Sequence, residues 1–162
     1  PDTGVFLPVR EPQKIHGFEI SGQYFVSDAL EIGANYTRFD GENTDTGEKL
    51  SGRYIAPAKF VIYADWQPTE NMKVSANFLN LANRKEFTAE DNKFVIYQGP
   101  VDGYSLVNLS ATYSLGAFEF YGGVENLFNE NYYTARAQSI FLSSYYSKAL
   151  GRTANLGMRF KF

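Results

Sequence analysis

The fold is decided by one stretch near the end of the sequence, Thr153-Ala154-Asn155-Leu156-Gly157-Met158-Arg159-Phe160-Lys161-Phe162. From Leu156 onward, large apolar residues stand at every second position, and glycine or basic residues fill the positions between them. Side chains alternate between the two faces of a β-strand, so this spacing predicts a strand with one apolar and one polar face. Helical spacing is hard to find anywhere in the sequence.

Six earlier segments repeat this alternation of apolar and polar residues. They cover residues 18–26, 30–37, 59–66, 72–78, 107–115 and 118–125. Together with the final stretch they predict seven strands, each of about ten residues or slightly more.

The predicted connections differ in length at the two ends of the strands. Short segments rich in turn-forming residues cover 27–28, 67–71 and 114–117, and long polar links cover 40–52, 84–103 and 129–151. Short turns at one end and long loops at the other are typical of an up-and-down antiparallel meander.

Aromatic side chains gather near both ends of the apolar face. At the short-turn end these are Tyr24, Trp66, Tyr113, Phe118, Phe160 and Phe162, and near the long-loop end Tyr36, Phe39 and Phe128. Ten tilted residues cover about 24 Å, which is the height of the apolar belt of a membrane barrel. Backbone groups cannot face lipid unpaired, so such a sheet must close. The alternative is a soluble lipocalin-like barrel, whose outward face would be the polar one.

Composition excludes several classes of function. The chain has 162 residues, which allows one domain or a fragment of a larger protein. It contains no Cys and one His, so disulfides, thiolate metal sites and Cys nucleophiles are excluded. A net charge of −3 argues against nucleic acid as a partner. The longest apolar run, about residues 60–64, is far too short for a membrane helix.

Four motifs, in order along the chain, carry a resemblance to a known family. They are Ile15-His16-Gly17-Phe18-Glu19, Ile55-Ala56-Pro57, Val124-Glu125-Asn126-Leu127-Phe128-Asn129-Glu130-Asn131-Tyr132, and Gly151-Arg152 followed by the alternating strand to Phe162. With them, residues 9–162 resemble the C-terminal third of a TonB-dependent outer-membrane receptor of the ferric-siderophore type.

The resemblance implies an all-β fold, an antiparallel up-and-down transmembrane β-barrel segment that supplies the last seven strands of a 22-stranded barrel. Residues 1–14, with three prolines and no alternation, are expected to form an extracellular loop, and residues 15–162 the strands and loops. The plug domain and the TonB-contacting segment of such receptors are expected to lie outside residues 1–162.

The resemblance also implies a function without covalent chemistry. The expected role is to form part of an active transporter in the outer membrane of a Gram-negative bacterium, importing a ferric siderophore with energy from TonB. No covalently bound cofactor and no metal site of the protein itself are expected. The expected partners are the bilayer, the TonB complex and the barrel-assembly machinery.

Aromatic and basic residues in the long links are the candidate ligand contacts. Tyr132, Tyr133 and Arg136 follow the family motif, and Tyr97 lies in the preceding link. Stacking and cation–π contacts suit the faces of a bulky, often anionic chelate. The alternative is that these residues pack the loops or belong to the aromatic belt.

Two further sets of residues have both a functional and a plain interpretation. Leu156, Met158, Phe160 and Phe162 resemble the signal read by the barrel-assembly machinery, although an ordinary strand can also end in Phe. For the charged residues on the polar face, the functional interpretation is contact with a plug or with water in the lumen, and the plain one is pairing across strands. For a residue that faces inward the two nearly coincide. This second set comprises Glu19, Glu31, Lys59, Lys73, Glu119, Glu125, Arg159 and Lys161.

Other functions find less support in the sequence. His16 has no second His with which to bind a metal, and it is expected to be solvated. Asp40, Glu42, Asp45 and Glu48 depart from the spacing of a calcium loop. A small complete barrel of eight strands, porin-like or adhesin-like, would need its eighth strand within residues 1–14. An outer-membrane esterase would need a Ser close to His16.

Overall fold

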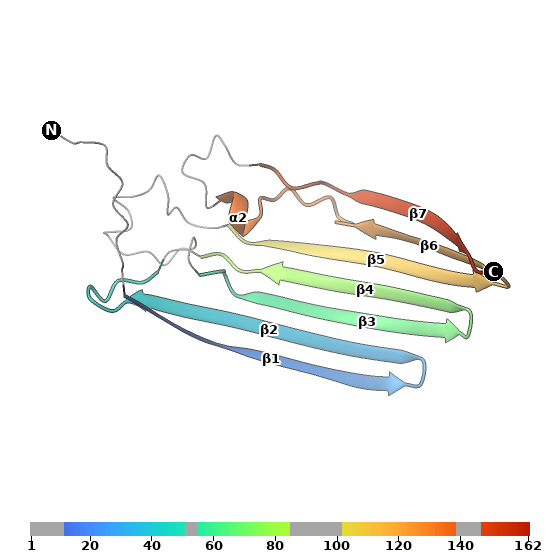
Figure 1. Ribbon diagram of the computed structural model, residues 1–162, viewed down its shortest axis with the longest axis horizontal. Coiled ribbons are helices and arrows are strands. Elements are labelled where there is room, and N and C mark those ends of the chain that lie inside the picture. Colours follow the sequence, from blue (N-terminus) through green and yellow to red (C-terminus); the bar gives the residue numbers. More distant parts are fainter. Residues whose placement is uncertain (1–11, 51–54, 85–101, 139–146) are drawn as a thin grey trace.

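A computed structural model describes residues 12–50, 55–84, 102–138 and 147–162. These residues form one sheet of seven antiparallel strands, each paired with its neighbours in sequence (Figure 1). The strands are β1 (Gln13–Ser27), β2 (Leu30–Asn43), β3 (Lys59–Thr69), β4 (Met72–Leu81), β5 (Tyr104–Leu115), β6 (Phe118–Glu125) and β7 (Thr153–Phe160). One short helix, α2 (Ala135–Gln138), precedes β7. The predicted seven-stranded meander is confirmed.

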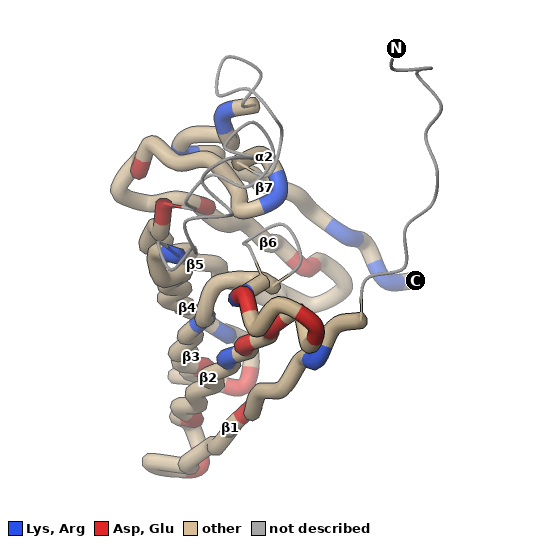
Figure 2. The backbone as a smooth tube through the Cα atoms, turned by 90° about the vertical axis from the view of Figure 1, so that its left-hand side faces the viewer, with Lys and Arg blue, Asp and Glu red and all other residues tan. Residues whose placement is uncertain are grey.

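The sheet is curved and has two free edges. Seen from the long-loop end of the strands, the sheet follows an open arc from β1 to β7 (Figure 2). In the part of the chain that the structure describes, β1 and β7 each pair on one side only. No helix among these residues is long and apolar enough to cross a bilayer.

The first hairpin is longer than the sequence indicated. β1 begins at Gln13, which pairs with Asn43, so the predicted loop over residues 1–14 ends before residue 13. The predicted link over residues 40–52 likewise begins only after β2 ends at Asn43. Beyond the apolar belt the outward face of these strands turns polar at Lys14, His16 and Asp40, and for that reason the alternation fades while the backbone ladder continues.

Two glycines close tight turns in the left-handed region of backbone space. Gly116 has φ 58° in the turn between Leu115 and Phe118, which are paired across the hairpin. Gly47 has φ 72° in the turn that follows β2. Residues with a Cβ are disfavoured at such angles, and glycine adopts them readily.

The apolar face of the sheet is exposed. Its large side chains stand open, for example Ile20 at 63%, Leu156 at 88% and Met158 at 56% relative exposure. The buried apolar core of the described residues consists of Leu50, Ile55 and Leu81. A water-soluble sheet would cover such a face, because covering one large apolar side chain contributes roughly 1.5–3 kcal/mol.

The polar face carries cross-strand hydrogen bonds and ion pairs. They join Glu19 to Asn35 at 2.8 Å, Glu31 to Tyr63 at 2.8 Å, Asp65 to Ser75 at 2.6 Å and to Lys73 at 2.9 Å, and Glu119 to Arg159 at 3.0 Å and to Lys161 at 2.6 Å. Pairing across strands is therefore observed for Glu19, Glu31, Lys73, Glu119, Arg159 and Lys161.

Three aromatic rings on the polar face lie over glycines of a neighbouring strand. Phe39 covers Gly17, Tyr63 covers Gly33, and Tyr121 covers Gly157. Such pairs fill the gap that a glycine leaves in a sheet. The assignment of Phe39 to the outer aromatic band is therefore wrong, because its register with Gly17 places it on the polar face.

Candidate ligand-binding site at the long-loop end

Asn126 holds the turn that follows β6 through hydrogen bonds of its backbone and its side chain. It is buried and has φ 51°, a conformation that Asn tolerates better than most residues. The backbone N–H of Asn126 donates to Oδ1 of Asn108 at 2.8 Å. Its own Nδ2 donates to the carbonyl of Glu130 at 2.9 Å, and the N–H of Glu130 donates back to Oδ1 at 2.7 Å. One amide side chain thereby closes the turn after β6.

Asn129 connects this turn to the start of β7. It also has a positive φ, 56°, and its N–H donates to the carbonyl of Asn126 at 2.8 Å. Its Oδ1 accepts the N–H of Arg152 at 2.9 Å. A Cβ at Gly151 would meet that same oxygen. The motifs at 124–132 and 151–152 therefore form one clasp, defined here as Asn126, Asn129, Gly151 and Arg152.

The clasp leads directly to an aromatic pair. Tyr132 packs against Tyr104, the first residue of β5, with ring centroids 4.3 Å apart and planes at 36°. The carbonyl of Tyr132 accepts the N–H of Ala149 at 3.1 Å. Tyr132 is half-buried, its ring is held by Tyr104 and its backbone by Ala149. The ring lies at the long-loop end of the sheet.

Gln138 fixes the helical turn that follows. It is buried, and its Nε2 donates to the carbonyls of Asp102 at 3.0 Å and Tyr133 at 2.9 Å. Its Oε1 accepts the N–H of Asp102 at 2.8 Å. Thr134 begins α2, because its hydroxyl accepts the N–H of Ala137 at 3.1 Å. Sequence reasoning missed Gln138 and Tyr104; Thr134 ahead of a helix-forming run was the available signal.

An open hollow of about 610 Å³ lies beside this aromatic pair, at the ends of β4 and β5. Tyr104, Glu130 and Asn83 contribute to its lining. Oδ1 of Asn83 accepts the N–H of Gly103 at 2.6 Å. Its volume falls within the roughly 300–1,000 Å³ of typical small-molecule sites.

The predicted contact residues separate into three groups. Tyr132 lies in the aromatic pair beside the hollow. Tyr133 forms an isolated antiparallel β-bridge with Lys148. Tyr133 and Arg136, which lies on α2, are both exposed at the same end of the molecule. Tyr97 lies outside the described residues.

The residues considered for metal binding do not converge. His16 is exposed in β1, opposite Asp40. Asp40 and Glu42 belong to β2, and Asp45 lies in the turn that follows. Within the described ranges, no three His, Asp or Glu side chains are placed to hold a metal ion together.

Comparison with known proteins agrees with this architecture. The family described as "TonB dependent receptor-like, beta-barrel" matches residues 2–127. The ferric aerobactin receptors of Escherichia coli and Klebsiella pneumoniae are each 26% identical over 147 residues. That alignment covers 88% of this chain and 18% of either receptor, so the chain spans less than a fifth of the length of these relatives.

Solved structures show the same fold at low sequence identity. The copper transporter OprC superposes with a TM-score of 0.75 at 16% identity, covering 93% of this chain and 24% of its own. The closed form of the ferric-catecholate import receptor Fiu from E. coli gives 0.68 at 21% identity, covering 93% of this chain and 21% of its own. With the family match over residues 2–127, these likenesses establish that the chain belongs to the TonB-dependent receptor-like β-barrels.

Proposed function

We propose that this chain forms part of an outer-membrane transporter that imports a ferric siderophore with energy supplied through TonB. The observation that carries the proposal is the fixed aromatic pair of Tyr104 and Tyr132 at the long-loop end of a barrel of this family. Two curated relatives are named ferric aerobactin receptors, which favours an iron chelate as the transported ligand.

The exposed edges of the sheet support a place within a larger barrel. β1 is exposed along its whole length, and β7 is exposed at all but one residue. Strand edges cannot face lipid unpaired. Further strands of the same receptor would therefore flank β1 and β7, and the exposed apolar face would lie against the bilayer of a Gram-negative outer membrane.

The end of β7 would serve the assembly of this barrel. Phe160 packs near Phe118 with ring centroids 5.1 Å apart, and Phe162 continues the line at 6.4 Å from Phe160. Leu156 and Met158 stand on the same face and are exposed. These four residues present one apolar ridge, which is the feature that the assembly machinery would read.

Tyr132, Tyr133, Arg136 and Tyr97 are the proposed ligand contacts. Tyr132 offers an aromatic face whose position is fixed, so little conformational entropy is lost when a planar chelate stacks on it. Arg136 would offset the negative charge of the chelate from an anchored helical turn.

The proposal is tested with the intact receptor that carries this chain, produced in a bacterium lacking its own siderophore receptors. Uptake of iron-55 aerobactin is measured for Tyr132→Ala and for Tyr24→Ala, which alters an exposed tyrosine at the opposite end. We expect roughly a tenfold loss for Tyr132→Ala and none for Tyr24→Ala, with equal amounts of receptor at the surface. Unchanged uptake by Tyr132→Ala would refute the role of the aromatic pair.

A further inference from the structure

The pairing between β5 and the chain that leaves β6 is displaced by one residue at Asn126. Leu109 pairs with Val124, so an undisturbed ladder would place Asn126 opposite Val107. Instead, the carbonyl of Val107 accepts the N–H of Leu127 at 2.8 Å. A displacement of this kind, a β-bulge, leaves one residue out of the ladder. The N–H of Asn126 therefore needs a partner outside the backbone.

The side chain of Asn108 supplies that partner. Its Oδ1 accepts the N–H of Asn126 at 2.8 Å, and its Nδ2 donates to Oδ1 of Asn77 at 2.9 Å. Because a backbone N–H can only donate, the oxygen of the Asn108 amide must face Asn126, which fixes the orientation of the whole group. Asn126 is 3% exposed, so its N–H would be buried and unpaired without this acceptor.

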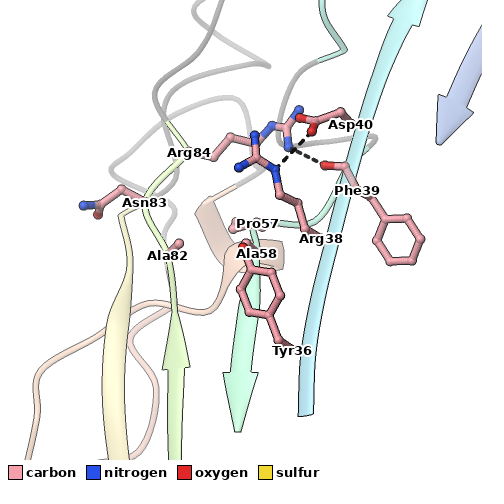
Figure 3. A pocket seen from close by; sticks show the side chains of 9 residues that line it. All are labelled: Tyr36, Arg38, Phe39, Asp40, Pro57, Ala58, Ala82, Asn83 and Arg84. Atoms are coloured by element: carbon pink, nitrogen blue, oxygen red, sulfur yellow. Dashed lines mark hydrogen bonds and ion pairs between the residues drawn. The ribbon is translucent and has the colours of Figure 1, made fainter. Parts of the chain in front are cut away.

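Arg84 has the opposite hydrogen-bonding role at the neighbouring end of β2. Figure 3 shows it donating to the carbonyl of Phe39, at 3.5 Å, and it also donates to the carbonyl of Leu50 at 3.0 Å. A carbonyl oxygen has two lone pairs and accepts donors from a broad range of directions, whereas an N–H donates along one direction. The contact between Asn108 and Asn126 is therefore the more directional of these constraints.

β5 holds the segment after β6 at two points on its polar face. Asn108 binds Asn126, and Tyr104 packs against Tyr132 with ring centroids 4.3 Å apart. Residues four apart in one strand lie on the same face, here about 13 Å from each other. Between the two points, Glu130 is bound to Asn126 through both its N–H and its carbonyl. The place of the Tyr132 ring thus depends on where Asn126 is held.

We propose that Asn108 is a positioning residue of the ligand-binding site. By binding Asn126 it sets the place of Tyr132 against Tyr104, and with it the affinity for the transported chelate. The inference rests on the proposed role of Tyr132 in ligand binding. Asn108 itself contacts Asn126 and Asn77, and it acts on the ligand through Tyr132.

The position of Tyr132 is measured first without any ligand, by fluorine NMR of the intact receptor with 3-fluorotyrosine at position 132. Tyr104→Leu gives the reference resonance of a ring that has lost its partner. In Asn108→Leu, which keeps the shape of the side chain and removes the acceptor, the resonance should move toward that reference. In Asn108→Asp, which keeps an oxygen facing Asn126, it should stay in place. An unchanged resonance in Asn108→Leu would overturn the proposal.

The effect on the ligand is measured as uptake of iron-55 aerobactin over a range of concentrations, in a bacterium lacking its own siderophore receptors. Asn108→Leu should raise the concentration for half-maximal uptake roughly tenfold, the usual effect of a lost buried hydrogen bond. The maximal rate per receptor at the surface should not change, and Asn108→Asp should behave as the unchanged receptor does. A lower maximal rate with an unchanged half-maximal concentration would overturn the proposal, because Asn108 would then only stabilise the fold.

Asn155→Leu is the matched control. Asn155 is an exposed asparagine on the polar face of β7, opposite Gly123 and outside the clasp. Its replacement makes the same chemical change and should alter neither the fluorine resonance nor the half-maximal concentration. Equal effects of Asn155→Leu and Asn108→Leu would overturn the proposal, because any apolar residue on this wall would then suffice.

The two measurements separate this inference from the proposed function. If the unchanged receptor takes up no iron-55 aerobactin, the proposed ligand is wrong. The fluorine resonance then still decides whether Asn108 positions Tyr132, because that measurement needs no ligand.

Discussion

The two ends of the sheet are stabilised by different means. At the short-turn end, tight hairpins and exposed ion pairs such as Glu119–Lys161 hold neighbouring strands together. At the long-loop end, the buried side chains of Asn126, Gln138 and Arg84 donate to backbone carbonyls. Where a tight turn joins two strands, the hydrogen bonds between the strands satisfy most of the backbone N–H and C=O groups. Where the chain leaves the sheet, its polar groups need other partners, and buried side chains provide them.

This comparison predicts that the largest loss of stability follows from Asn126→Ala. The change removes three side-chain hydrogen bonds and places alanine at φ 51°, which together should cost about 3 kcal/mol. The free energy of unfolding of the intact receptor in detergent, measured with urea, tests this. Asn131→Ala is the control, because Asn131 is exposed in the same segment. Equal effects of the two changes would contradict the clasp.

Gln138→Leu should have the next largest effect. It leaves the N–H of Asp102 and two carbonyl groups without the side chain that now binds them, at a cost of about 2 kcal/mol. Hydrogen exchange at the amide of Asp102 should accelerate by roughly the corresponding factor of thirty. In Gln23→Leu, at an exposed position of β1, that amide should exchange as in the unchanged protein. No acceleration in Gln138→Leu would show that α2 is held by other contacts.

Glu119→Gln at the short-turn end should have the smallest effect. Its partners Arg159 and Lys161 are about two-thirds exposed, and ion pairs of this kind contribute about 0–1 kcal/mol. The effect should shrink further in high salt, which screens exposed charges, whereas the loss in Asn126→Ala should not change. The same urea measurement at low and high salt tests both statements. A large, salt-independent loss for Glu119→Gln would remove the contrast between the two ends.

The sequence predicts the sheet well because period-two alternation is repeated in every strand. It is less informative where the outward face of a strand turns polar, as at the long-loop ends of β1 and β2. Gln13 and Asn43 pair in the ladder above the apolar belt, but their polar neighbours read as loop. Phe39 was assigned by its residue type to the aromatic band, although its register with Gly17 places it on the polar face.

The candidate site was only partly accessible to sequence reasoning. The family motif pointed to Tyr132, but its packing against Tyr104 joins residues from separate segments and appears only in three dimensions. Gln138 is of a residue type that is usually solvated in loops, and its neighbours in the sequence do not indicate that it is buried.

The rings that lie over glycines have a consequence for the space inside the barrel. Phe39, Tyr63 and Tyr121 lie across Gly17, Gly33 and Gly157, so each covers its neighbouring strand. An aromatic ring that stood upright on this wall would narrow the interior by most of its own length. Because these rings lie across the glycines, they project less from the polar face at these three positions. A large body that shifts or rearranges within the barrel would meet flat ring faces at these three positions.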